Sequence, residues 1–271
     1  MPRIYKQIII ALIFFLIAGG FGFLIYWVNQ PAPACFDGIK NQDEEEIDCG
    51  GLCQSCEVRA LKNLEILWAQ GLYVKDGFYD LAAKIKNPNQ NYGSGKISYS
   101  FNFYDKSNNL IGQKKGAAYI LPQQTKYLIF PKVESPAPLK KVELLFEPIK
   151  WQKLKDYQPS ELIISRKEYS LSSLNQPAKS QVSGLVTNKT NFDFDRIDID
   201  VLLFNQDGKL IGLNITQANT LPAGQERQFV VSWVEPLKEP VALIEAEAET
   251  NLFDSLNYMK RYGAPEKFRE Y

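Results

Sequence analysis

The sequence predicts a mainly β protein that is attached to a membrane and carries two tandem antiparallel β-sandwiches. Three observations support this prediction. An apolar run without charges lies near the N-terminus, all four cysteines fall in one short segment, and a pattern of alternating strands occurs twice, about one hundred residues apart.

The apolar run extends from Ile8 to Val28 and contains 21 residues without a charged side chain. As a helix it would be roughly 31 Å long, close to the thickness of the hydrocarbon core of a bilayer. A helix also satisfies its own backbone hydrogen bonds in lipid. We therefore expect a transmembrane helix over residues 8–28 that serves as the membrane anchor.

The charges around this run predict its orientation. Arg3 and Lys6 precede it, whereas the first basic residue after it is Lys40. This asymmetry predicts a single-pass protein with residues 1–7 in the cytoplasm and the C-terminal domains outside it. A cleaved signal peptide is an alternative because residues 32–34 have a small-x-small pattern, and lipidation of Cys35 is another. The run is longer than a signal-peptide core of about 7–15 residues, which favours a retained signal anchor.

The four cysteines follow in a predicted spacer and cysteine-rich module, residues 29–57. Two interpretations compete: a zinc site with four thiolate ligands, or two disulfides. Only one pair has the CxxC spacing of a zinc ribbon, and disulfides persist outside the cytoplasm, so the second interpretation is favoured. The sequence leaves all three possible pairings open for Cys35, Cys49, Cys53 and Cys56.

Acidic residues are concentrated between the first two cysteines, where six acids accompany the single base Lys40. Oxygen ligands in a closed loop favour Ca²⁺, which is the one cofactor that the sequence suggests. The alternative is a solvated acidic loop, and the ligand spacing of an EF-hand is absent. The calcium candidates are Asp37, Asn41, Asp43, Glu44 and Asp48.

The same run resembles a cysteine-rich motif that recurs in secreted and surface proteins, C-x-D-G-x-x-N-G-x-E-x-x-x-D-C-G-G-x-C-x-x-C. The resemblance covers about 22 residues, and Gln42 stands where the motif usually has glycine. It implies an extracellular, disulfide-bonded module. The matching residues are Cys35, Asp37, Gly38, Asn41, Glu44, Asp48, Cys49, Gly50, Gly51, Cys53 and Cys56.

The rest of the chain contains an internal repeat. Apolar residues alternate with mostly polar ones over residues 97–103 and again over residues 197–203, and a turn follows each run. Further matches are the Leu-Ile-Gly and Leu-Pro sequences at residues 110–112, 210–212, 121–122 and 221–222. The repeat predicts two small Ig-like sandwiches over residues 58–150 and 151–250, with a linker over residues 149–160 and a polar tail over residues 251–271.

Each copy resembles the bacterial FxLYD-type and late-embryogenesis-abundant type 2 sandwiches. The shared outline is a strand that ends in Asn, an alternating strand with a turn, and a Leu-Pro before the last apolar strand. The resemblance implies a fold and no catalytic residues. Asn108 departs from the usual glycine of the turn, and the matching positions are Asn87, residues 103–105 and 121–122, then Gly184, Asn188, residues 204–205, 207–208 and 221–222.

The alternation also predicts individual environments. Phe101 and Val201 should face the cores, whereas Ser100 and Asp200 should face solvent, and each sandwich should unfold independently. Tryptophans at positions 68, 151 and 233 favour core packing over a sugar-binding face.

Composition narrows the function. The chain has no histidine, which excludes Ser-His and Cys-His catalysis, and its 31 acidic residues balance 31 basic ones, which argues against nucleic acid. No nucleotide-binding or hydrolase motif is present, so we expect no enzyme. The expected function is presentation of two sandwiches for protein interaction or envelope structure. Alternatives are an accessory subunit of a secretion, pilus or cell-wall machine, and a glycan- or peptide-binding module; the protein partner is not identified.

Overall fold

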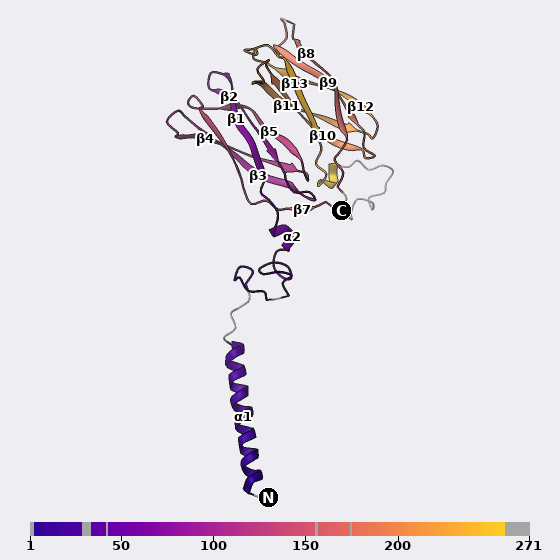
Figure 1. Ribbon diagram of the computed structural model, residues 1–271. Helices are drawn as coiled ribbons and strands as arrows, with labels where there is room; N and C mark the ends of the chain where they lie inside the picture. The colour runs from indigo at the N-terminus through magenta and orange to yellow at the C-terminus, as the bar shows by residue number, and fades with distance from the viewer. Residues whose placement is uncertain (1–2, 29–33, 42, 155–156, 174, 258–271) are drawn as a thin grey trace. The chain divides into compact units, whose positions relative to one another are not determined.

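The computed structural model describes residues 3–28, 34–41, 43–154, 157–173 and 175–257. Most of the predicted spacer, part of the predicted linker and most of the predicted tail therefore lie outside the described residues. The chain divides into two compact units, Met1–Leu61 and Lys62–Tyr271. The first contains the helix and the cysteine-rich module, and the second contains the sheets (Figure 1).

Helix α1 (Arg3–Val28) contains the predicted anchor, and none of its residues is buried by the protein. It is long and apolar enough to cross a membrane, and a signal sequence would have the same properties. The prediction of an N-terminal apolar helix is therefore confirmed. The remaining described helices are short: α2 (Cys56–Arg59) and a single 3-10 turn, η1 (Ser255–Asn257).

The first sandwich consists of two antiparallel sheets. One sheet has the order β1-β2-β5 and the other has the order β4-β3-β6. Part of the predicted linker forms a two-residue strand, β7 (Gln152–Lys153). It pairs with the first two residues of β3, Tyr92 and Gly93. The strands are β1 (Glu65–Lys75), β2 (Phe78–Lys86), β3 (Tyr92–Tyr104), β4 (Leu110–Ile120), β5 (Thr125–Glu134) and β6 (Lys141–Phe146).

The second sandwich repeats this arrangement. Its sheets have the orders β8-β9-β12 and β11-β10-β13, so each of its strands occupies the place of the strand seven positions earlier in the chain. The internal repeat in the sequence thus corresponds to two copies of one strand topology. The strands are β8 (Leu162–Leu171), β9 (Ser180–Asn188), β10 (Phe194–Phe204), β11 (Leu210–Leu221), β12 (Glu226–Trp233) and β13 (Leu243–Glu249).

One buried asparagine in each copy explains two of the repeated sequence features. Asn87 directly follows β2, and its Nδ2 group donates to the carbonyl oxygens of Tyr92 and Leu121. Asn188 ends β9 and donates in the same way to Phe192 and Leu221. Both side chains are fully buried. In each copy the side-chain amide therefore links the end of one strand to the leucine of the Leu-Pro sequence, which belongs to the facing sheet. A buried amide needs hydrogen-bond partners of this kind.

The turns after β3 and β10 also correspond. Gly208 has a φ of 73° and Asn108 has a φ of 62°, and the amide of each donates to the carbonyl oxygen three residues earlier. Glycine adopts this left-handed conformation without strain, and asparagine tolerates it better than most residues do. The departure from glycine at position 108 therefore preserves the turn.

Each sandwich has its own core. Phe101 packs in the first core and Val201 in the second, and both side chains are fully buried. Trp151 packs against the first core, Trp233 lies in the second, and Trp68 packs against a third cluster described below. The expectation that the tryptophans serve packing agrees with these positions.

Cavity-forming substitutions test the two cores. Phe101→Ala should lower the free energy of unfolding by about 3–5 kcal/mol, and Val201→Ala by somewhat less, because each leaves a void in a fully buried site. Ser100→Ala, in the partly buried position beside Phe101, should change it by no more than about 0.5 kcal/mol. Calorimetry of the full chain measures all three. Equal effects of Phe101→Ala and Ser100→Ala would contradict the inward placement of Phe101.

Candidate functional site: the disulfide module and the cleft between the sandwiches

The four cysteines form two disulfides, which settles the question that the sequence left open. Cys35 pairs with Cys53 and Cys49 pairs with Cys56, and no cysteine is free. The prediction of two disulfides is confirmed. Four-thiolate zinc binding is incompatible with this state because all four sulfur atoms are used. The two bridges stand in for the hydrophobic core that so short a segment cannot build.

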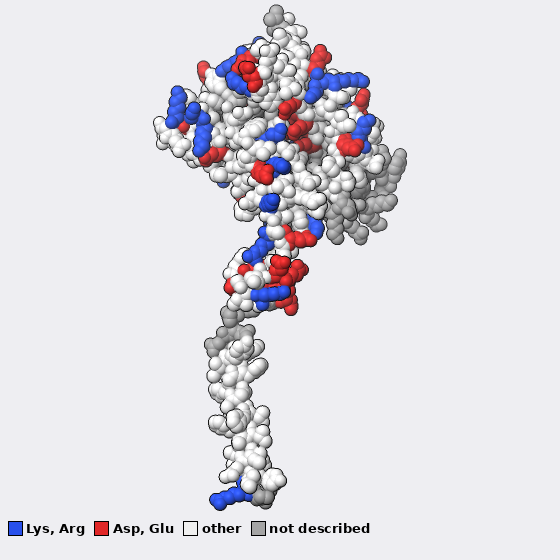
Figure 2. Space-filling view, viewed as in Figure 1, with Lys and Arg blue, Asp and Glu red and all other residues white. Residues whose placement is uncertain are grey.

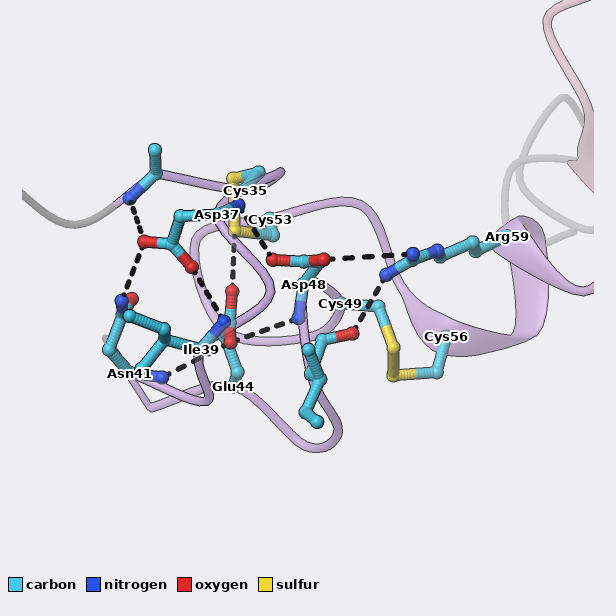
Figure 3. The surroundings of a disulfide bond; sticks show 12 residues. Cys35, Asp37, Ile39, Asn41, Glu44, Asp48, Cys49, Cys53, Cys56 and Arg59 are labelled. Carbon is cyan, nitrogen blue, oxygen red and sulfur yellow. Dashed lines mark hydrogen bonds and ion pairs between the residues drawn. A yellow bond between two sulfur atoms is a disulfide. The ribbon is translucent and has the colours of Figure 1, made fainter.

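Three of the acidic side chains in this module act as acceptors for backbone amides (Figure 3). Asp48 Oδ1 accepts from the amides of Asp37 and Gly38 at 3.0 and 2.9 Å. Glu44 Oε2 accepts from the amides of Asn41 and Asp48 at 3.2 and 3.1 Å. Asp37 accepts from the amides of residues 34 and 39 and from the side chain of Asn41, and these bonds lower its pKa. The carboxylates thereby take the place of secondary structure.

Two further contacts close the module. Arg59, at the end of α2, donates to the carbonyl oxygen of Ile47 at 2.7 Å and lies 3.7 Å from Asp48 Oδ2. Gly50 has a φ of 85°, and a Cβ atom there would lie 2.6 Å from the backbone nitrogen of Glu45. Only glycine fits this position without a backbone shift.

The calcium prediction remains a prediction. Asp37, Asn41, Glu44 and Asp48 lie in one network (Figure 3). The three carboxylates already accept the bonds described above, whereas Asn41 Oδ1 is buried and has no hydrogen-bond partner among the described residues. Asp43 is exposed and occupies a turn with a φ of 59°. Among the described residues, the one group with metal-ligand spacing is Glu46, Cys49 and Cys56, and its two sulfur atoms belong to a disulfide.

Reduction should act on this module alone. We expect no reactive thiol in the native protein and four after denaturation and reduction, as measured by alkylation and mass spectrometry. Reduction of the folded protein should expose residues 35–56 to protease and leave the sandwiches intact, because they contain no cysteine. Retention of alkylatable thiols in the native protein would contradict the disulfide assignment.

The two sandwiches meet through a separate apolar cluster. It joins side chains of β2 and β5 in the first sandwich to side chains of β10 and β11 in the second. Burial of this shared surface favours coupled unfolding, in place of the independent unfolding that the repeat alone predicts. The buried members are Ala82, Tyr127, Ile129, Leu202, Leu210 and Leu213, with Trp68 and Phe204 packed against them.

Beside this cluster the facing surface of the second sandwich becomes acidic. Asp198 and Asp200 on β10 lie opposite Glu249 and Glu247 on β13 in the strand register, and Leu202 lies opposite Glu245. Because side chains alternate between faces, these residues share the outer face of the sheet. In Figure 2, acidic and basic atoms lie next to one another along the line where the sandwiches meet.

Basic and phenolic groups of the first sandwich pair with part of this acidic surface. Lys126 Nζ lies 2.5 Å from Glu249, and both side chains are buried. Tyr127 donates its hydroxyl to Glu245 at 2.6 Å and accepts from Lys84 Nζ at 2.8 Å. These contacts connect β2 and β5 to β13, and charge-assisted hydrogen bonds of this kind are the stronger class.

Two carboxylates of this surface have no such partner. Among the described residues, nothing forms a hydrogen bond or an ion pair with the side chain of Asp200 or Glu247. Burial, and next the charge of Glu249, raise the pKa of Asp200 to about 8 and that of Glu247 to about 7. Asp200 points away from its own core, as expected, but it is half-buried and not fully exposed, because part of the outer face of β10 packs against the first sandwich.

The sequence contains one signal for this interface, which the alternation of the strands does not explain. Strand β13 has the sequence Leu-Ile-Glu-Ala-Glu-Ala-Glu, so three glutamates share one face. Three like charges on one face at a spacing of two indicate either a solvated edge or a polar interface, and the sequence cannot distinguish them.

The raised pKa of Asp200 predicts a pH-dependent stability. The folded state holds this proton more tightly than the unfolded state, whose pKa is near 3.8, so its contribution is complete below pH 4 and is lost as pH rises through about 8. Glu247 adds the same trend up to about pH 7. Asp200→Asn should therefore stabilise the protein at pH 9, by about 1–4 kcal/mol, and leave it little changed at pH 4.

Thermal melting at pH 4, 7 and 9 measures this effect. Asp207→Asn is a matched control because Asp207 lies exposed in the turn after the same strand. Parallel melting profiles for the Asp200→Asn variant and the unmodified protein would show that Asp200 is ionised and solvated.

Two clefts flank the apolar cluster between the sandwiches. The polar one has a volume of about 810 Å³ and is lined by Asp198, Asp200, Lys126, Tyr119 and Glu249, among others. The second has a volume of about 650 Å³ and a more apolar lining that includes Trp233 and Tyr73. Asp80 lies in the second cleft, where burial raises its pKa to about 6.

These features define a class of protein: a mainly β chain with an N-terminal apolar helix, a module with two disulfides and two joined sandwiches. A comparison with models of known protein families found no match, and a comparison with curated proteins also found none. The function is therefore inferred from the residues and their geometry.

Proposed function

We propose that this protein is a single-pass membrane protein that presents its two sandwiches outside the cytoplasm for protein interaction, without enzymatic activity. Helix α1 is the retained anchor, and residues 1–7 are cytoplasmic. The observation that carries the proposal is the module with two disulfides after an apolar helix, because disulfides persist in oxidising compartments. Arg3 and Lys6 before the apolar run support the same orientation.

The interface between the sandwiches supports a role in presentation. A shared apolar cluster and a buried ion pair join the sandwiches into one compact unit. A unit of this kind holds an interaction surface in a fixed shape, which lowers the entropic cost of binding. Each sandwich is proposed to be related to the FxLYD-type and late-embryogenesis-abundant type 2 folds, on the basis of the repeated sequence features and the shared strand topology.

A second candidate function is ligand binding. It is favoured by the two clefts, which lie where pockets commonly form, at a boundary between domains. Convergent polar groups in one cleft and aromatic side chains in the other are typical of binding sites for small molecules or peptides.

Protease protection tests the proposed topology. The full chain, with one tag at each end, is expressed in cells, and membrane vesicles with the outer face exposed are treated with protease. The C-terminal tag should be degraded and the N-terminal tag should be protected, because only residues 1–7 are expected inside. A mature chain that begins near Cys35 and has lost its N-terminal tag would show instead that the apolar helix is a cleaved signal.

A further inference from the structure

The disulfide module, residues 35–56, leaves its apolar side chains exposed, which is unfavourable in water. Phe36 is 87% exposed and Leu52 is 86% exposed, and among the described residues outside α1 no large apolar side chain is more exposed than Phe36. Disulfides, carboxylates and backbone amides form the network of Figure 3, so the module is held together without these apolar side chains. The other two large apolar residues of the segment, Ile39 and Ile47, are exposed as well.

A disulfide holds the two most exposed side chains near each other. Phe36 follows Cys35 and Leu52 precedes Cys53, and the Cα atoms of the two paired cysteines lie 5.5 Å apart. One further Cα–Cα step on each side keeps the Cα atoms of Phe36 and Leu52 within about 13 Å of each other. Two large side chains at this spacing can contact one apolar surface together.

A retained anchor would keep this pair close to a membrane surface. Only seven residues separate Val28, the last residue of α1, from Phe36. The eight Cα–Cα steps between them span at most about 29 Å, and the headgroup region beyond the hydrocarbon core is about 5–8 Å thick on each side. So short a tether gives the module a high effective concentration beside the bilayer, so that even weak apolar contacts become populated.

The charges of the module indicate which lipid surface suits it. Three of its acidic side chains accept the backbone amides described above, whereas Asp43, Glu45 and Glu46 are exposed. Exposed carboxylates are repelled by anionic headgroups, and a zwitterionic surface lacks this repulsion. Insertion of apolar side chains, and not attraction between charges, would therefore drive contact with the membrane.

We propose that the disulfide module is a second membrane contact, in which Phe36 and Leu52 insert into the interfacial region of the bilayer that α1 spans. This inference rests on the proposed function, because it requires α1 to be a retained anchor. The two disulfides suit such a role, since a module that is already ordered loses little conformational entropy when its side chains enter the lipid.

Photo-crosslinking of the full chain in phosphatidylcholine vesicles tests the proposal. The Phe36→p-benzoylphenylalanine variant is irradiated, and mass spectrometry of its peptides measures the lipid adduct. The yield should exceed that of Phe192→p-benzoylphenylalanine, a matched control in the second sandwich, at least about 10-fold, because only the first position is expected to enter the lipid. Flotation of the vesicles reports separately whether α1 holds the chain in the membrane.

Two further variants assign the contact to the apolar pair. Leu52→Ser should lower the adduct yield at position 36 about 3-fold, because the inserted apolar area decreases. Leu171→Ser, at an exposed leucine of the second sandwich, should leave the yield unchanged. Replacement of half of the lipid by phosphatidylglycerol should also lower the yield, and added salt should restore it. The absence of reactive thiols checks that each variant keeps both disulfides.

The outcomes separate this inference from the proposed function. A chain that floats with the vesicles but gives no adduct at position 36 would overturn the inference and leave the anchor in place. A chain that does not float would overturn both. The same variant is also irradiated in the membranes of the cells that express it. An adduct to protein in place of lipid would show that a partner protein covers Phe36, which would likewise overturn the inference.

Discussion

The buried ion pair between Lys126 and Glu249 is the constraint on which the joined sandwiches depend. Both charges are removed from water, which costs several kcal/mol per ion unless the geometry and the surrounding hydrogen bonds compensate. The pair therefore tolerates little movement of one sandwich against the other. The hydroxyl of Tyr127, between Lys84 and Glu245, adds a second connection beside it. The apolar cluster supplies non-directional attraction, and these polar contacts select a single arrangement.

The two sandwiches share one strand topology, but the outer faces of their corresponding sheets carry different side chains. This difference allows the two sandwiches to associate into one unit. In β3 of the first copy the outward residues are Ser98 and Ser100, whereas the corresponding residues of β10 are Asp198 and Asp200. The cores have equivalent positions, such as Phe101 and Val201, and obey the same packing rule. The cores therefore explain why each copy folds, and the outer faces explain how the two copies associate.

Local patterns made the sandwiches predictable, and the lack of local information made the interface unpredictable. Alternation over residues 97–103 and 197–203 identified the buried faces, and the turn residues identified where strands end. Cysteine content predicted two disulfides, but the pairing of Cys35 with Cys53 depends on the path of the loop in space. The environment of Asp200 differs from the predicted one for a related reason. A period of two shows that a side chain leaves its own core, and it contains nothing about what covers the other face.

The carboxylates that β10 and β13 place between the sandwiches make the folded protein less stable than apolar side chains in the same positions would. Asp200 and Glu247 are neighbours across two strands, and like charges in that position repel. An apolar pair of similar volume would extend the cluster formed by Leu202 and Leu213 and would remove the contribution of these two carboxylates to the pH dependence of folding. Strain and unsatisfied polar groups of this kind are concentrated where proteins bind ligands, because binding compensates for them. Asp200 lines the polar cleft and Glu247 lines a neighbouring one, so the two carboxylates open into different spaces between the sandwiches.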